Sequence, residues 1–319
     1  MPVGIPADLW RKLIPASNPM TTEKVALGQQ LYFDKGLSLD GTMSCATCHD
    51  PATGYADRHA VAIGMEGKLG MRNAPTILNA IFQPVQFWDG RAHSLEEQAK
   101  QPLLNPSEMG MKDQDAVVAR VNSLPEYSSR FRRVFGAEGI TFDTIVKAIA
   151  AFERSQLSGN APFDHFLAGN QNAITETQKQ GWRLFHGKAQ CIGCHAFKSS
   201  SPFFTDFQFH NTGIAARNKN LDQLTGRMSQ EATSSKESNQ GLSSLAHSED
   251  FSELGRYLAS KQRKDVSHQA HNSKRSWLMN RIVTFLAANR CLETELQTKE
   301  HRNTGDILRI KERVKERKL

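Results

Sequence analysis

The sequence predicts an all-α protein built from two similar halves. Apolar residues recur at helical spacing in many segments of the chain. The pattern Cys-x-x-Cys-His occurs twice, at residues 45–49 and 191–195, and each copy follows a Gly-x-x-Leu-aromatic pattern, at residues 28–32 and 181–185. This weak internal repeat indicates two related units, and 319 residues suffice for two domains of ordinary size.

The order of the elements follows from local signals. Four prolines among the first 19 residues predict an extended N-terminal arm over residues 1–21. Thr21 or Thr22 caps the first helix, and Gly187 fits the end of a later one. Helices are predicted at residues 22–33, 94–100, 113–122, 125–135, 141–157, 175–186, 250–259 and 276–289, with a glycine-rich loop after residue 49, a domain join at 158–174, a polar loop at 215–250 and a charged tail at 291–319.

The two repeated motifs indicate covalent attachment of c-type haem. Two cysteines at this spacing can form thioethers to the vinyl groups of one haem, and the adjacent histidine then supplies an axial imidazole to the iron. Chance predicts only about 0.003 such motifs from the cysteine and histidine content. A redox dithiol or a zinc site, the alternatives, would leave both histidines without a role. The predicted haem-binding residues are Cys45, Cys48, His49, Cys191, Cys194 and His195, with His49 and His195 as iron ligands.

Charge and hydropathy limit the partners and the compartment. The net charge of +7 is dispersed, which disfavours nucleic acid, and no apolar run of about 18 residues predicts a membrane span. Because c-type haem is attached outside the cytoplasm, a bacterial periplasmic protein is expected. Residues 1–5 lack the features of a signal peptide, so a mature form or a misassigned start is inferred. Cys291 is expected to be a free thiol.

Longer stretches around the motifs resemble the bacterial di-haem cytochrome c peroxidase family, which includes the methylamine-utilisation di-haem oxidases. The resemblance runs from about residue 27 to residue 265. It implies two cytochrome-c-like domains with one covalent haem each, a peroxidatic domain at residues 22–165 and an electron-accepting domain at 166–290. The matching segments are LYFD (31–34), LSLDGTMSC (37–45), RNAPT (72–76), FWDGRA (87–92), LEEQA (95–99), PSEMG (106–110), FHNTG (209–213) and LGRY (254–257).

The resemblance also implies a function and its residues. Such proteins reduce hydrogen peroxide to water with electrons from a small c-type cytochrome or a cupredoxin, and a homodimer is among the expected assemblies. Glu108 and Gln98 match residues of the peroxide pocket, Trp88 matches a tryptophan between the haems, and Asn73 matches a ligand of a structural calcium. O–O cleavage requires a proton on the leaving oxygen, which a carboxylate can carry. The alternatives are a loop carboxylate for Glu108, core packing for Trp88 and a surface helix position for Gln98.

Two departures from the family pattern affect the irons. Met65 stands where relatives often carry a histidine that blocks the first iron; it is either a weak ligand or an apolar loop residue that leaves the iron open. His59 is near but out of register. Beyond Asp265 the family pattern is lost, which leaves the sixth ligand of the second haem undecided. Its candidates are Met228, Tyr257, His268, His271 and Met279.

Three other functions remain open at the level of sequence. A methylamine-utilisation-type oxidase would use the same haem pair to oxidise a protein or a small organic substrate, and Met65 makes this alternative plausible. A di-haem electron carrier would need both irons six-coordinate and no role for Glu108. A damaged family member would carry a miscoordinated second haem.

Overall fold

The computed structural model describes residues 1–70 and 72–209. This part of the chain is helical and contains isolated β-bridges but no strand, as the sequence predicts. It forms two compact units, one of Met1–Ser158 with residues 207–209 and one of Gly159–Asp206. The predicted features that lie outside the described residues are the helices at 250–259 and 276–289, the loop at 215–250, the tail at 291–319, Cys291, and the ligand candidates Met228, Tyr257, His268, His271 and Met279.

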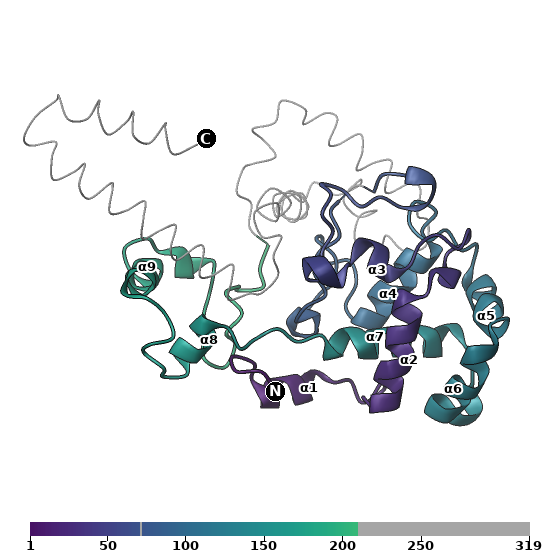
Figure 1. The fold of residues 1–319 in the computed structure, drawn as a ribbon, viewed down its shortest axis with the longest axis horizontal. Helices are drawn as coiled ribbons and strands as arrows, with labels where there is room; N and C mark the ends of the chain where they lie inside the picture. Colours follow the sequence, from purple (N-terminus) through teal and green to yellow (C-terminus); the bar gives the residue numbers. More distant parts are fainter. Residues whose placement is uncertain (71, 210–319) are drawn as a thin grey trace, which may run out of the picture. The chain divides into compact units, whose positions relative to one another are not determined.

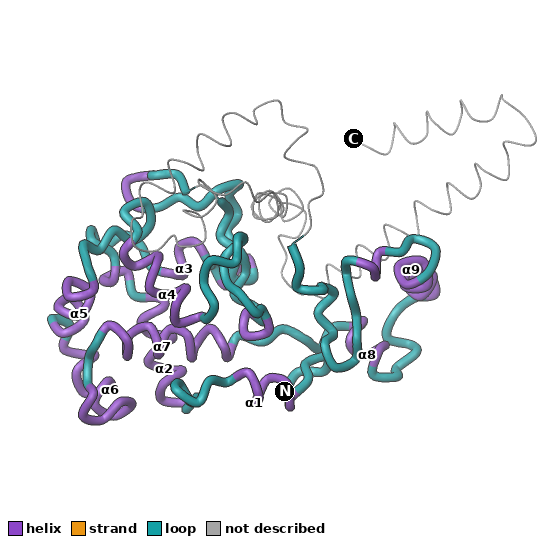
Figure 2. The backbone as a smooth tube through the Cα atoms, turned by 180° about the vertical axis from the view of Figure 1, so that it is seen from behind, coloured by secondary structure: helices purple, strands orange, loops and turns teal. Residues whose placement is uncertain are grey.

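The helices mostly begin and end where local signals predict (Figures 1 and 2). In the first unit they are α1 (Ala7–Leu13), α2 (Thr22–Phe33), α3 (Cys45–Cys48), α4 (Leu95–Leu104), α5 (Gln114–Asn122), α6 (Pro125–Phe135) and α7 (Phe142–Ser155), with 3₁₀ turns η1 (Lys35–Leu37), η2 (Pro51–Thr53), η3 (Met65–Gly67), η4 (Ala80–Phe82) and η5 (Gly136–Glu138). In the second unit they are α8 (Pro162–Leu167), α9 (Glu176–His186) and the 3₁₀ turn η6 (Cys191–Gly193). Figure 2 shows that the segment between α3 and α4 is mainly loop, which confirms the predicted loop after residue 49.

Side chains at the helix starts explain the accurate boundaries. The Thr21 hydroxyl accepts a hydrogen bond from the Lys24 N–H at the start of α2, and Thr175 does the same for Gln178 in α9. These caps satisfy N–H groups that have no partner inside the helix. Gly187 ends α9, as predicted.

Two predicted boundaries were wrong. The N-terminal arm is not wholly extended, because α1 forms between Pro6, its N-cap, and Pro15. The two prolines stand far enough apart to leave room for two turns of helix, and a proline just before a helix does not disrupt it. The helix that begins at Leu95 does not end near residue 100 but continues through Pro102 to Leu104. Leu95, Ala99 and Leu103 are buried on one face of the helix. The free energy gained by this burial outweighs the loss of the backbone hydrogen bond that Pro102 cannot donate.

The first unit is organised around the crossing of α2 and α7, which is visible in Figure 1. A Cβ at Gly28 would lie only 1.9 Å from the Ala148 carbonyl oxygen, so glycine is required for the close approach of the two helices. Leu31 and Ile145 are buried at this interface. Tyr32, fully buried on α2, donates its hydroxyl to the carbonyl of His49 at 3.1 Å. The crossing therefore positions the first haem motif.

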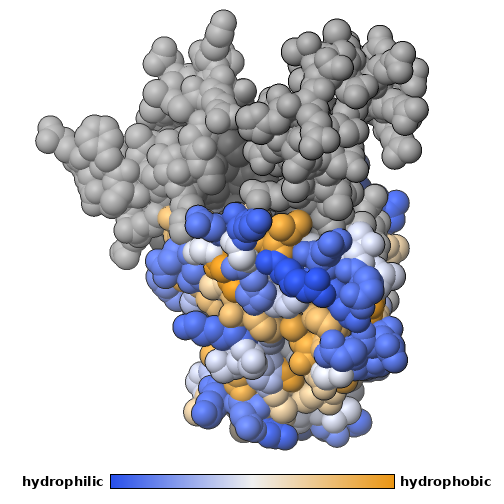
Figure 3. All heavy atoms as spheres, turned by 90° about the vertical axis from the view of Figure 1, so that its left-hand side faces the viewer, coloured by the Kyte–Doolittle hydropathy of each residue, from blue (hydrophilic) through white to orange (hydrophobic). Residues whose placement is uncertain are grey.

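The second unit has a small aromatic core. The ring centroids of Phe163 and Trp182 are 5.0 Å apart, and those of Phe197 and Phe204 are also 5.0 Å apart. Phe185 is 1% exposed. On the face seen in Figure 3, hydrophobic residues of the described part lie among hydrophilic ones. No helix within residues 1–70 or 72–209 is long and apolar enough to cross a membrane.

Candidate active site

The first Cys-x-x-Cys-His motif is one capped helical turn. The Ser44 N–H donates to the Thr47 hydroxyl at 2.9 Å, which fixes the start of α3. The turn places the half-buried thiols of Cys45 and Cys48 on one side of the helix, because positions i and i+3 are neighbours. The next backbone N–H, that of His49, donates to the Cys45 carbonyl at 2.9 Å. The two thiols and the imidazole thus come from one rigid segment.

The imidazole of His49 is oriented by backbone carbonyls. Its Nδ1 donates to the Pro75 oxygen at 2.8 Å and lies 3.3 Å from the Tyr55 oxygen. This arrangement leaves Nε2 for an iron, which is the tautomer that histidine ligands adopt. Burial lowers the pKa of His49, although the two carbonyls oppose the shift, so the neutral ligating form is favoured.

The surroundings of the two thiols fit an apolar macrocycle. Burial is the largest cause that raises the pKa of both cysteines, to about 12 for Cys48. Buried Tyr32 lies beside them, with ring centroids 6.1 Å from Tyr55 and 4.9 Å from Phe152. The thiols, the free Nε2 and this aromatic cluster together suit a haem at the first motif.

The second motif repeats the local chemistry in a more open setting. The His195 Nδ1 donates to the Phe204 carbonyl at 3.2 Å, and the His195 N–H donates to the Cys191 carbonyl at 2.9 Å. Cys191 is half-buried, whereas Cys194 and His195 are exposed. Because the imidazole again keeps its Nε2 free, these residues also fit an axial ligand and two thioether positions.

Glu108 lies in the loop after α4 and is half-buried. The Asn105 side chain donates to Glu108 Oε1 at 2.9 Å. Burial raises the pKa of Glu108, and the Arg91 charge and the Asn105 hydrogen bond oppose that rise. The Glu108 charge acts in turn on the thiols of Cys45 and Cys48. The carboxyl therefore lies near the first haem motif, with a pKa shifted toward neutral pH, as a group that exchanges protons requires.

Helix α4 brings Gln98 to the same side as the residues that hold Glu108. Gln98, Gln101 and Asn105 follow one another at i, i+3 and i+7, so they share one face of the helix. Asn105 reaches Glu108 from this face, and Gln101 Oε1 accepts from Arg91 Nε at 3.0 Å. Gln98 therefore shares a helix face with Asn105, the residue that holds Glu108.

Trp88 and Asn73 are joined by a hydrogen bond. The Trp88 Nε1–H donates to the Asn73 carbonyl at 2.8 Å, and Trp88 is half-buried. The side-chain nitrogen of buried Asn73 donates to the carbonyls of Asp57 at 3.1 Å and His59 at 2.6 Å. Its Oδ1 is the atom that a calcium ion would contact. Within the described ranges there is no cluster of three His, Cys, Asp or Glu residues that could hold a metal.

Met65 is packed inside the protein. It is 4% exposed, and a Cβ at Gly110 would lie 2.1 Å from its terminal methyl. The Met65 N–H donates to the Glu108 carbonyl at 3.2 Å, and a Cβ at Gly64 would meet the Ser107 oxygen at 1.9 Å. The loop of Met65 therefore rests on the loop of Glu108, which supports the packing role for Met65 that the sequence left open.

His59 also has a structural partner. Its Nδ1 lies 2.8 Å from Asp57 Oδ1, and the carboxyl of Asp57 is buried. This interaction explains the position of the His59 side chain without a role as an iron ligand.

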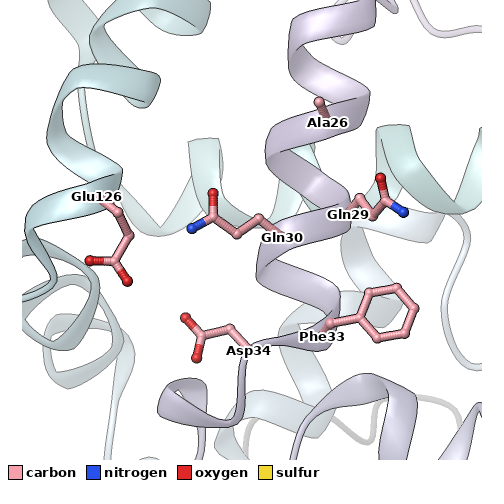
Figure 4. A pocket seen from close by; sticks show the side chains of 6 residues that line it. All are labelled: Ala26, Gln29, Gln30, Phe33, Asp34 and Glu126. Atoms are coloured by element: carbon pink, nitrogen blue, oxygen red, sulfur yellow. The ribbon is translucent and has the colours of Figure 1, made fainter.

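An open depression elsewhere in the first unit is separate from these residues. Figure 4 shows two side chains that face Glu126 of α6: Gln30, which belongs to α2, and Asp34, which directly follows α2. None of the predicted site residues lines it. We assign it no part in the chemistry.

Sequence reasoning overlooked three residues around Glu108. Arg91 and Asp89 stand in the FWDGRA segment, next to Trp88, but their charges were not considered. Asn105 precedes a proline and a serine, and its Oδ1 accepts the Ser107 N–H at 2.9 Å. An Asn-Pro pair is a recognised turn signal, which could have identified Asn105 as the residue that shapes the Glu108 loop.

Comparisons with known proteins identify the family of the chain. The family model for di-haem cytochrome c peroxidase matches residues 22–172. Cytochrome-c peroxidase IdrP2 of Denitromonas iodatirespirans is 32% identical over 267 residues, which cover 82% of this chain and 69% of that protein. The chain belongs to the di-haem cytochrome c peroxidase family. The resemblance inferred from the sequence is thereby confirmed, and membership of this family implies haem c as the cofactor.

Other relatives lie on the methylamine-utilisation side of the family. Methylamine utilization protein MauG of Methylorubrum extorquens is 44% identical over 205 residues, which span 64% of this chain and 57% of that protein. Among solved structures, a MauG-like protein associated with microbial copper homeostasis matches with a TM-score of 0.57 at 35% identity, over 63% of this chain and 61% of that one. The chain thus spans less than two thirds of the length of these relatives.

Proposed function

We propose that this family member is a di-haem cytochrome c peroxidase that reduces hydrogen peroxide to water. The electron donor would be a small c-type cytochrome or a cupredoxin. The observation that carries the proposal is Glu108, a half-buried carboxyl beside the first haem motif whose pKa is raised by burial. A relative named as a cytochrome-c peroxidase, 32% identical over 267 residues, supports the same activity.

The proposed reaction is H₂O₂ + 2e⁻ + 2H⁺ → 2H₂O. A haem held by Cys45, Cys48 and His49 would supply the redox chemistry of this reduction. Glu108 accepts a proton from one peroxide oxygen and delivers it to the other, which leaves as water. Asn105 holds the carboxyl in place by its 2.9 Å hydrogen bond. Gln98 orients the peroxide by hydrogen bonds, and both protons that the equation consumes come from solvent.

The second motif serves electron entry in this proposal. Cys191, Cys194 and His195 hold the haem that accepts electrons, and Trp88 lies on the route to the first haem. The hydrogen bond from Trp88 to the Asn73 carbonyl fixes the indole ring. The proposal places these haems in two cytochrome-c-like domains with one covalent haem each, at residues 22–165 and 166–290, as the family resemblance implies.

Three further features belong to the proposal. The protein is periplasmic, since covalent haem attachment takes place there. A calcium ion bound through Asn73 and a homodimeric assembly follow the family resemblance. The calcium ligands expected beyond Asp265 and the sixth ligand of the second haem lie outside the described residues.

A methylamine-utilisation-type oxidase is the second candidate. It is favoured by 44% identity to a methylamine utilization protein over 64% of this chain. Met65 in place of a histidine, packed against Gly110, also makes this alternative plausible. The two functions share the proton chemistry of Glu108 but differ in the origin of the electrons.

Steady-state kinetics of the matured protein test the proposal. Mass spectrometry should first show two covalent haems per chain, with Cys291 unmodified. Peroxide turnover should then depend on a reduced small cytochrome or cupredoxin. A fully matured, folded protein that carries two haems but turns over no peroxide with either donor class would exclude the peroxidase. Oxidation of an organic or protein substrate by peroxide would then identify the oxidase.

A further inference from the structure

Two of the four tyrosines of the chain contact His49. The Tyr32 hydroxyl donates to the His49 carbonyl at 3.1 Å, and the Tyr55 carbonyl lies 3.3 Å from Nδ1 of the imidazole. The rings of Tyr32 and Tyr55 meet edge to face, with their centroids 6.1 Å apart and their planes at 70°. A hydrogen bond, the covalent bonds of one residue and a ring contact therefore join the predicted iron ligand to both phenols.

The fold holds the two rings in place. Phe152 of α7 packs against both of them, with its centroid 4.9 Å from Tyr32 and 6.5 Å from Tyr55. Tyr55 has a φ of +61°, in the left-handed region that a residue other than glycine seldom adopts. Its N–H donates to the Asp50 carbonyl at 2.7 Å. The conformation of Tyr55 is thus imposed by its surroundings and not by its local preference, as strained residues at functional sites often are.

The two phenols differ in where their protons can go. A phenol gives up an electron readily only when its proton leaves at the same time. Tyr32 is fully buried, and its hydroxyl points at a backbone carbonyl, which is not a base. Tyr55 is half-buried, and no hydrogen bond within the described residues occupies its hydroxyl, so solvent can accept its proton. Oxidation should therefore end at Tyr55, with Tyr32 as the bridge.

We propose that Tyr55 is a one-electron oxidation site of the first haem motif, at which small phenols are oxidised. In the reaction with peroxide, one electron passes from Tyr55 through Tyr32 and His49 toward the haem, and the phenolic proton of Tyr55 goes to solvent. A phenol, ArOH, then returns one electron and one proton to the Tyr55 radical and becomes ArO•.

Two such cycles give H₂O₂ + 2ArOH → 2H₂O + 2ArO•. Phenols are the substrate class because a phenol and a tyrosyl radical exchange an electron and a proton between like groups. The inference rests on the proposed function for its oxidant, peroxide, and it adds a reductant whose electrons do not enter through the second motif.

Electron paramagnetic resonance of freeze-quenched samples tests the site. The matured, oxidised protein is mixed with peroxide without a donor protein, and a tyrosyl signal should form. Tyr55→Phe should lose it, although the variant keeps the ring and the carbonyl beside His49. Tyr32→Phe removes only the hydroxyl on the bridge and should slow the appearance of the signal. Tyr127→Phe is the matched control and should keep the signal, since Tyr127 is a fully buried tyrosine whose hydroxyl donates to Asp34.

Two further measurements give the proposal independent ways to fail. Mass spectrometry of the parent protein, after peroxide and a nitroso spin trap, should find the adduct on Tyr55, and this needs no variant to fold. Oxidation of 2-methoxyphenol by peroxide should be lost in Tyr55→Phe and kept in Tyr127→Phe.

The haem absorption spectrum shows separately whether peroxide has reacted. A reaction with peroxide that gives no tyrosyl signal, a signal that persists in Tyr55→Phe, or an adduct only on other residues would overturn the inference and leave the peroxidase proposal intact. A haem spectrum that peroxide does not change would refute the proposed function and this inference with it, so the two failures are distinguishable.

Discussion

The two haem motifs share one pattern of residues but differ in what surrounds them. In the first, His49 is half-buried, and its Nδ1 donates to the Pro75 carbonyl at 2.8 Å and lies 3.3 Å from the Tyr55 carbonyl. In the second, His195 and Cys194 are exposed, and His195 donates to Phe204 at 3.2 Å. The pattern by itself provides haem ligands in both places. Proton chemistry also requires a group that exchanges protons. Among the described residues, only the first motif has such a group nearby, the half-buried carboxyl of Glu108.

Substitution of Glu108 should separate the two motifs most strongly. If Glu108 moves the proton, Glu108→Gln should slow the reaction with peroxide by about 10²–10⁴-fold, because a general acid–base group is lost. Both haem spectra should stay unchanged. Stopped-flow absorbance measures the rate, and Glu66→Gln, an exposed carboxylate on the Met65 loop, is the matched control. A rate within a few-fold of the parent would remove Glu108 from the mechanism.

A change at Met65 should alter only the first haem. The packing of Met65 against Gly110 predicts an open first iron in the oxidised protein, which reacts with peroxide without prior reduction. Met65→His should produce a low-spin first haem and a requirement for one-electron reduction, because imidazole is a stronger ligand for ferric iron than a thioether.

Electron paramagnetic resonance before and after peroxide addition measures both properties of the Met65 variants. Met65→Leu is the control, since it keeps an apolar side chain and cannot ligate. A purely low-spin signal from both haems of the parent, lost in Met65→Leu, would show that Met65 is a ligand after all.

Glycine substitutions compare the rigidity of the two units. A Cβ at Gly28 would lie 1.9 Å from the Ala148 oxygen, whereas a Cβ at Gly193 meets nothing within 4 Å. Gly28→Ala should therefore cost about 1–3 kcal/mol of unfolding free energy, the range for overpacking. Gly193→Ala should change it by less than about 0.5 kcal/mol. Thermal unfolding monitored by circular dichroism distinguishes them, and equal losses would contradict the close α2–α7 contact.

Glu153 should give the smallest and most pH-dependent effect. It is buried on α7, its Oε2 has no hydrogen-bond partner in the described part of the chain, and burial raises its pKa from 4.5 to about 8. The unfolded chain ionises this carboxyl more readily, so stability falls as the pH rises from about 4.5 to 8. Residues 159–206 contain no buried carboxylate, so this effect is confined to the first unit.

Glu153→Gln should remove the slope and raise the free energy of unfolding at pH 8, with little change at pH 5. Denaturant unfolding at the two pH values measures this, with exposed Glu66→Gln as the control. An equal effect at both pH values would show that Glu153 ionises normally in the folded state.

Local signals sufficed for most of the helices and for the haem motifs, but not for α1 or α8. The caps Thr21 and Thr175 and the first-turn Pro125 define helix starts because they act on N–H groups within one turn. A wrong boundary, as at Pro102, arose where burial of distant side chains outweighed a local preference. Glu108, Gln98 and Trp88 were identified through the family resemblance, not through spacing alone.

The sequence by itself determined the family, the helical class and the two haem motifs, because each depends on residues close together in the chain. Only the tertiary structure decided what those residues experience. The pKa of Glu108 depends on burial and on Arg91, 17 positions earlier in the chain, and His49 is oriented by the Pro75 carbonyl. Such effects act through space over a few ångströms. They exist only after the loops between α3 and α4 have folded back onto the first motif.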